Sequence, residues 1–189
     1  MRDWNKTFEL LKGAVLQPEP TWRAFRSRRT GWRDTAFAVA VPMAAAVAVL
    51  APILAWLFGS NVLPGLGGLL AQMLLLFVGG LLALALSGAV FGLIAGSFGG
   101  RSSFDDGFAA VTLASVPGFA GQLVGAVPLI GWLAALGLSI YSLVLLYRNQ
   151  PVFLGIPENR RVAHFVVSLV ILVVVWMLVS APVAGLFMP

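Results

Sequence analysis

The chain has 189 residues, of which 60% are apolar and only 10% are charged, against about 25% charged residues in soluble domains. So few charges cannot cover the surface of a soluble protein of this size, whereas bilayer lipid needs no such covering, so the composition indicates a membrane protein. The absence of cysteine and the single histidine, His164, exclude disulfides, thiolate metal sites and a multi-histidine metal centre within one chain, and we expect no cofactor.

Charged residues divide the chain into two predicted parts, a cytosolic entry segment over 1–33 and an apolar transmembrane domain over 34–189. The entry segment carries charges throughout and has no apolar run of the length that a cleavable signal peptide requires. We therefore expect the first apolar span to act as the insertion signal.

An amphipathic helix is predicted over 3–16, because apolar residues recur there at helical spacing on one face. A second short helix is expected from residue 20 or 21, after two prolines that end the first. We expect the apolar side chains of both helices to lie in the headgroup plane and contact acyl chains: Trp4, Phe8, Leu11, Trp22 and Phe25. The segment then either only anchors the first span, which we favour, or forms a face that senses a partner or membrane curvature.

Uncharged stretches give the number of spans. No Asp, Glu, Lys or Arg occurs within 35–100, 107–147 or 162–189, and one crossing needs about 20 residues. Turn residues divide the two longer stretches near 59–65 and 125–128. The sequence thus predicts an all-α bundle of five spans, at 35–58, 67–97, 107–124, 129–147 and 163–186. The second is longer than one crossing requires, so we expect it to be tilted, kinked at Gly79-Gly80 or frayed at its ends.

The basic residues predict the orientation. With five spans, all twelve Lys and Arg residues fall on one side, in the entry segment and in the 98–106 and 148–161 loops. Basic residues that flank spans stay in the cytosol, so the N-terminus is predicted inside and the C-terminus outside. The nearest partner of these charges is anionic cytoplasmic lipid, and we expect no nucleic acid.

Small residues at four-residue spacing let helices approach closely in lipid. Gly88, Gly92 and Gly96 show this spacing in the second span, and Gly121 and Gly125 in the third. They serve either packing within the bundle, which we favour, or a homo-oligomer interface. Pro117 is expected to kink the third span, because proline removes a backbone hydrogen bond.

No enzyme is indicated. The stretch 85–88 lacks the first glycine of the G-x-S-G motif of intramembrane serine proteases, and His164 is expected at the membrane interface, at the cytosolic start of the last span. No charge is predicted within the hydrocarbon core, which excludes a carboxylate proton relay and leaves neutral groups such as Ser87, Gln122 and Ser142.

A polar cluster at the predicted cytosolic face is the candidate binding site. It contains Arg101, Asp105 and Asp106 from the second loop, Arg148, Arg160 and Arg161 from the third, and Arg23 from the entry segment. One aspartate is expected to cap the third span, and the other to pair with an arginine.

Several motifs from residue 104 onward resemble the Yip1 domain family of membrane proteins. They are Phe104-Asp105-Asp106-Gly107-Phe108, Ala114-Ser115-Val116-Pro117, Pro128-Leu129-Ile130-Gly131, Tyr141 and Tyr147, Ile156-Pro157 and Arg160-Arg161, with Pro18-x-Pro20-Thr21-Trp22 upstream. The resemblance implies five spans and a cytosolic N-terminus.

Eukaryotic members of that family associate with small GTPases and vesicle machinery of the early secretory pathway. This chain lacks their long N-terminal region and its Asp-Leu-Tyr-Gly-Pro motif, so we do not carry the GTPase partner over. The Ala-, Gly- and Arg-rich composition resembles prokaryotic members and points to a bacterial inner membrane.

Two functions remain open on the sequence alone. The first is a non-enzymatic scaffold or interaction protein that engages a protein partner or lipid headgroups at its cytosolic face, which the missing core charges favour. The alternative is a small channel or a lipid or solute transporter, which the breaks in the third and fourth spans favour, because broken helices can line a path.

Overall fold

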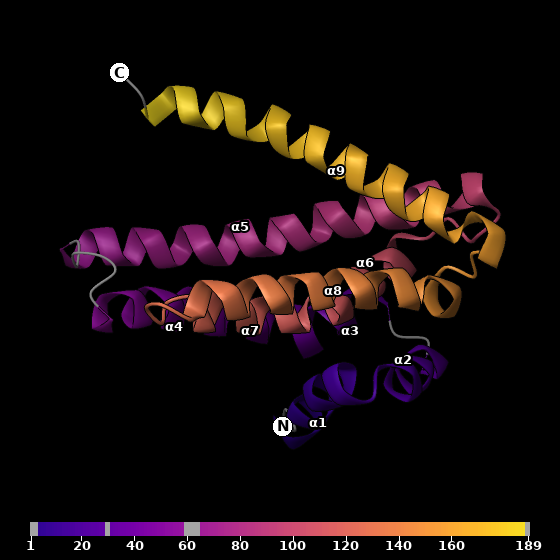
Figure 1. Cartoon of the computed structure of the whole chain (residues 1–189), viewed down its shortest axis with the longest axis horizontal. Helices are drawn as coiled ribbons and strands as arrows, with labels where there is room; N and C mark the ends of the chain where they lie inside the picture. Colours follow the sequence, from indigo (N-terminus) through magenta and orange to yellow (C-terminus); the bar gives the residue numbers. More distant parts are fainter. Residues whose placement is uncertain (1–3, 29–30, 59–64, 188–189) are drawn as a thin grey trace.

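The computed structural model of the chain describes residues 4–28, 31–58 and 65–187 (Figure 1). Within them the protein is all-α, and helices alternate with short connections. The elements are α1 (Trp4–Leu16), α2 (Pro18–Ser27), α3 (Trp32–Thr35), the π-helical turn η1 (Ala36–Ala40), α4 (Val41–Leu57), α5 (Leu66–Leu93), the 3-10 turn η2 (Ile94–Phe98), α6 (Phe104–Ala114), α7 (Val116–Val124), α8 (Gly131–Phe153) and α9 (Glu158–Phe187).

Five stretches of the described residues are helical, long and apolar enough to cross a membrane, which confirms the predicted number. They are Trp32–Leu57, Leu66–Phe98, Phe104–Val124, Gly131–Phe153 and Glu158–Met177. The helices run beyond the predicted ends at 147 and 163, because loss of apolar character marks the limit of the hydrocarbon and not the end of hydrogen bonding. The predicted turn at 59–64 lies outside the described residues.

The second span has no helix break at Gly79-Gly80, where a kink was one of three expectations. α5 continues through Gly79 and Gly80, since glycine keeps its backbone hydrogen bonds and only weakens a helix. The span ends instead by tightening into η2, and Gly99 then turns the chain at φ 79°.

The third span is broken at Ser115, between α6 and α7. Pro117 stands in the first turn of α7 and has no N–H to give to the preceding turn. Ser115 Oγ donates to the Val111 carbonyl at 2.7 Å, which also accepts the Ser115 N–H. Beside the break, the Gly118 N–H donates to Ser142 Oγ on α8 at 2.8 Å. The break therefore joins this span to α8.

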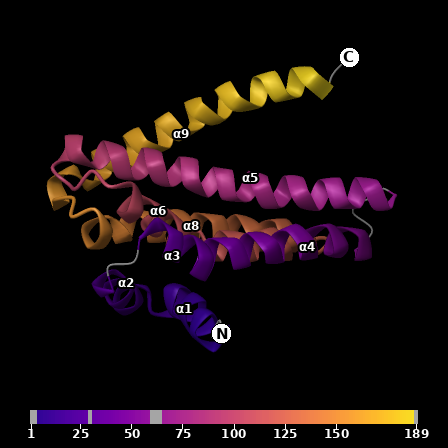
Figure 2. The same cartoon turned by 180° about the vertical axis from the view of Figure 1, so that it is seen from behind.

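α6 is the centre of the fold, and every residue from Gly107 to Ala114 is buried. α5 lies along one side of it and α8 along another, and α9 leaves α5 at an angle, touching the bundle near its own start (Figures 1 and 2). The connections α5–α6 and α8–α9 meet at one end of the bundle, which carries Arg101, Arg160 and Arg161 and which we call the charged end.

Glycines allow α5 and α6 to touch backbone to backbone. A Cβ added to Gly88 would stand 2.6 Å from Phe108 Cα, and one on Gly92 would stand 2.9 Å from Gly107 Cα. Gly121 likewise faces Ala135 on α8, where an added Cβ would lie 3.2 Å from the carbonyl oxygen. The other two glycines also face residues of the same chain: a Cβ added to Gly96 would meet Ser102, and one added to Gly125 would meet Gly121 and Ala135.

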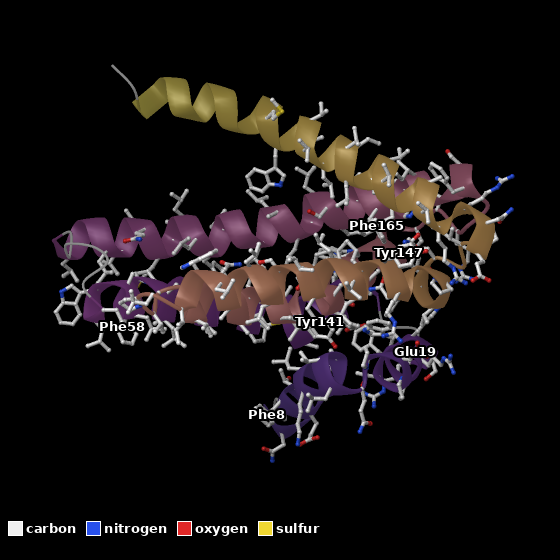
Figure 3. The ribbon with its side chains drawn as sticks, in the orientation of Figure 1. Phe8, Glu19, Phe58, Tyr141, Tyr147 and Phe165 are labelled. Carbon is white, nitrogen blue, oxygen red and sulfur yellow. The ribbon has the colours of Figure 1, made fainter. Side chains whose placement is uncertain are left out.

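The entry segment is a helical hairpin docked on the bundle. Tyr141, on the side of α8 that faces α1, donates its hydroxyl to the Val15 carbonyl at 2.7 Å (Figure 3). Trp22 and Phe25 are 0% and 5% exposed, so their expected contact with acyl chains is wrong: α2 turns them into the protein core, where they pack among other buried apolar side chains.

The remaining predicted interface residues differ among themselves. Phe8 is 65% exposed, as a lipid-contacting residue requires, whereas Leu11 is half-buried against the core. The side chain of Trp4 lies outside the described part.

The close contact between α5 and α6 predicts that adding one methyl group at Gly92 lowers the stability of the protein. Gly92→Ala forces two backbones apart, because the added Cβ meets backbone atoms of Gly107 that cannot rotate away. We expect a loss of about 1–3 kcal/mol in the free energy of unfolding. Thermal unfolding of the purified protein in detergent measures it. Gly79→Ala is the matched control on the same helix, since nothing lies within 4 Å of its added Cβ. Equal stability of the two variants would contradict the packing.

Candidate functional site

The first turn of α6 lies at the charged end, and its cap leaves two carboxylates available there. Ser103 is the N-cap of α6, and its Oγ accepts the Asp106 N–H at 3.2 Å. Neither aspartate caps its own helix, so that expectation is wrong. The pattern Ser103-x-x-Asp106 is a capping-box spacing and could have identified the cap from the sequence. A hydroxyl that takes this role leaves both carboxylates free for other partners.

Asp105 caps a different helix. Its Oδ1 accepts the N–H of Trp32 at 3.1 Å, and Trp32 is the first residue of α3. The N-cap of α3 is Gly31, which has no side chain to satisfy that N–H. Asp105 therefore supplies the missing cap from a distant part of the chain and fixes the start of the first span against α6.

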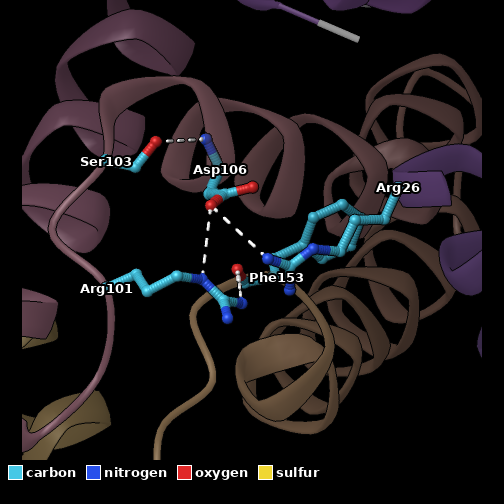
Figure 4. A network of polar contacts seen from close by, with 5 residues as sticks. All are labelled: Arg26, Arg101, Ser103, Asp106 and Phe153. Atoms are coloured by element: carbon cyan, nitrogen blue, oxygen red, sulfur yellow. Dashed lines mark hydrogen bonds and ion pairs between the residues drawn. The ribbon is translucent and has the colours of Figure 1, made fainter. Parts of the chain in front are cut away.

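Asp106 joins three segments. Its Oδ2 lies 3.7 Å from Arg26 Nη2 of α2 and 3.8 Å from Arg101 Nε of the 99–103 loop (Figure 4). Arg101 also donates from Nη2 to the Phe153 carbonyl at the end of α8, at 2.9 Å. We call these residues, with the cap Ser103, the Asp106 cluster. Both ion pairs are longer than a hydrogen bond, so Asp106 attracts the two guanidinium groups without using up their donors.

Arg26 is a partly buried charge of the cluster. Its side chain is 29% exposed, and in the part of the chain that the structure describes it donates no hydrogen bond. Burial lowers the pKa of its guanidinium from the usual value, Asp106 opposes this shift, and the positive charge of Arg101 adds to it. A partly buried guanidinium with unused donors is a site that an anion would stabilise.

A cavity of about 920 Å³ opens beside the Asp106 cluster. Three arginines line it, together with both aspartates and an apolar wall. The lining includes Arg23, Arg26, Arg161, Asp105, Asp106, Phe25, Pro151 and Phe153. We call it the arginine cavity.

The predicted site residues divide between this cavity and its surroundings. Arg23, Arg161, Asp105 and Asp106 line it, and Arg101 stands behind Asp106. Arg148 points to the hairpin instead, where its Nη2 bonds Glu19 Oε1 at 2.8 Å, and Arg23 lies 3.7 Å from the other oxygen of Glu19.

Arg160 is exposed beside the loop of Gly99, outside the cavity lining. Arg26 and Glu19 were absent from the predicted site, since no short-range pattern shows that the hairpin folds back onto α6 and α8.

His164 is a buried bridge between helices. It is 0% exposed, its Nδ1 lies 3.0 Å from Gln150 Oε1, and its Nε2 lies 2.9 Å from the Phe91 carbonyl. It thus links α9 to α8 and α5. No group of three or more metal-ligating residues occurs among those described.

Comparison with known proteins agrees with this architecture. The Yip1 domain model matches residues 12–180, and so covers the second helix of the hairpin and all five long helices. No curated protein and no solved structure matches the chain. The match extends over most of the sequence and includes every motif quoted above for the resemblance. The chain belongs to the Yip1 domain family and is a multi-pass membrane protein.

Proposed function

We propose that this protein is a non-enzymatic interaction protein whose charged end, on the cytosolic side of a bacterial plasma membrane, binds the phosphate of an anionic lipid headgroup. The observation that carries the proposal is Arg26, a partly buried guanidinium with unused donors at the wall of the arginine cavity. Arginine binds phosphate through two parallel hydrogen bonds, which Asp106 at 3.7 Å does not provide.

The composition of the cavity supports a lipid as the source of the phosphate. Three arginines face two aspartates, and the Trp32 N–H already neutralises part of the charge of Asp105. Phe25, Pro151 and Phe153 provide an apolar wall, against which the glycerol and upper acyl chain of a lipid can pack. A soluble phosphate would leave that wall bare.

The charge distribution supports the orientation. The charged end gathers the basic loops, and basic residues that flank spans are retained in the cytosol. The cytosolic leaflet is the anionic one, and each nearby Lys or Arg is attracted to it by about 1 kcal/mol. The lipid with the matching charge is therefore on the side that the arginine cavity would face.

Lipid binding is expected to depend on Arg26. Titration of the purified full chain with phosphatidylglycerol, followed by native mass spectrometry, should show tighter binding than with phosphatidylcholine. Arg26→Gln should weaken the anionic lipid about tenfold, the effect of losing one charged hydrogen bond. Arg148→Gln is the matched control, because Arg148 bonds Glu19 outside the cavity lining. Equal losses of lipid affinity in the two variants would mean that the lipid responds only to the general surface charge and not to Arg26.

Glycerol phosphate added to the same titration separates the two sources of phosphate. It should compete poorly, since it does not reach the apolar wall. Competition as strong as that of the lipid would argue for a soluble ligand, and competition by an acidic peptide alone would argue for a protein partner.

The two aspartates are expected to respond differently. Asp106→Asn removes both ion pairs and should lower the unfolding free energy of the lipid-free protein by about 1 kcal/mol. The same change frees Arg26 and should strengthen phosphatidylglycerol binding severalfold. Asp105→Asn keeps an oxygen for the Trp32 N–H and should leave the unfolding free energy unchanged, whereas Asp105→Ala should destabilise the protein. The gain in lipid affinity of Asp105→Asn should be smaller than that of Asp106→Asn, because Asp105 holds no arginine among the described ion pairs. Thermal unfolding and lipid titration measure both effects, and a loss of lipid affinity in Asp106→Asn would refute the competition between carboxylate and phosphate.

The orientation has its own test. A reporter that is active only in the cytosol should function when fused to the N-terminus and should be inactive when fused after Pro189. Activity at both ends, or only at the C-terminus, would reverse or exclude the proposed topology.

A further inference from the structure

A second cavity, of about 420 Å³, lies inside the membrane-spanning part, between α4, α5, α7 and α8 and beside the break at Ser115. Its lining contains five neutral polar side chains among apolar ones: Ser87, Ser115, Gln122, Ser139 and Ser142. No charged residue lines it. We call it the neutral cavity, and it is separate in lining from the arginine cavity.

Two of these serines are satisfied by their own helices and three polar groups are not. Ser115 and Ser139 donate to the carbonyls of Val111 and Ala135, at 2.7 and 2.8 Å. Ser142 accepts the Gly118 N–H and donates to no described residue, and Ser87 and Gln122 have no hydrogen bond in the described part of the chain. In hydrocarbon an unpaired hydroxyl or amide is costly, so these groups favour a ligand that can bond to them.

The cavity opens toward lipid. α4 packs on both α5 and α7, and α7 packs on α8, whereas α5 and α8 have no sizeable interface among the described helices. The opening therefore lies between α5 and α8, where Leu76 and Leu143 stand at the wall. A ligand can enter sideways from the bilayer with its hydrocarbon chain still in lipid.

We propose that the neutral cavity binds the uncharged head of a glycerolipid that has a free hydroxyl and ester carbonyls, of the diacylglycerol class. The ester carbonyls accept from the Gln122 amide and the Ser87 hydroxyl, and the lipid hydroxyl donates to the Gln122 carbonyl. A phospholipid is excluded, because the cavity offers no cation to a phosphate and burying that charge unpaired is prohibitive.

Photolabelling of the full chain in nanodiscs tests this. The probe is a diacylglycerol with a diazirine on its acyl chain, and labelled peptides are mapped by mass spectrometry. We expect labels on α5 and α8 around the cavity, and competition by unlabelled diacylglycerol but not by phosphatidylglycerol. Equal competition by phosphatidylglycerol would mean ordinary lipid around the protein and would overturn the proposal.

Three variants make the test specific. Gln122→Leu and Ser87→Ala should each reduce labelling about three- to tenfold, as the loss of one neutral hydrogen bond implies. Gly80→Leu should block it, because a Cβ there has only Ala44 nearby, at 3.9 Å, and the longer side chain fills the cavity.

Gln72→Leu, on α5 but outside the lining, is the matched control. Since Gln122 bonds to nothing in the described chain, its replacement should leave thermal unfolding unchanged. Unchanged labelling in both the Gln122 and the Gly80 variants would also overturn the proposal. Arg26→Gln should leave labelling intact, so failure of the arginine cavity is distinguishable from failure of this one.

Discussion

The contact between the backbones of α5 and α6 positions almost everything else. Gly88 and Gly92 admit Gly107 and Phe108 without intervening side chains, and the start of α6 is then tied to α5 by hydrogen bonds. The Ser103 N–H donates to the Gly92 carbonyl at 3.3 Å, and Ser102 Oγ donates to the Leu93 carbonyl at 2.9 Å. Asp105 and Asp106 follow these bonded residues closely in the sequence, so the contact between α5 and α6 also fixes their positions.

The third span contributes to both proposed binding sites. Its start belongs to the arginine cavity, and its break lies beside the neutral cavity. Its first turn presents carboxylates that attract arginines, and beside its interruption at Ser115 the Gly118 N–H donates to Ser142 of α8. The proposed charged ligand would thereby bind at the end of the bundle, and the proposed neutral ligand within it. This separation follows the cost of each group in hydrocarbon, which is far higher for a charge than for a hydroxyl.

Local patterns were enough to predict the helices, and tertiary folding determined the site. The gaps between charges gave five spans, and glycine spacing indicated the helix contacts, because both are local consequences of bilayer thickness and backbone size. The hairpin was misjudged for the opposite reason. Trp22 and Phe25 have the same amphipathic pattern whether their apolar face meets lipid or protein, so the pattern alone cannot distinguish the two. Arg26, Glu19 and the burial of His164 were missed because each depends on contacts between residues far apart in sequence.

The docked hairpin also constrains how the protein can be made. Val15 and Glu19 leave the ribosome early, yet their partners Tyr141 and Arg148 belong to α8 and follow 126 and 129 residues later. Until α8 is inserted, Trp22 and Phe25 have no protein core to enter, and an apolar surface of this kind must be held by the membrane or by a chaperone. The hairpin can therefore reach its docked position only after the fourth span has been inserted, although it is synthesised first.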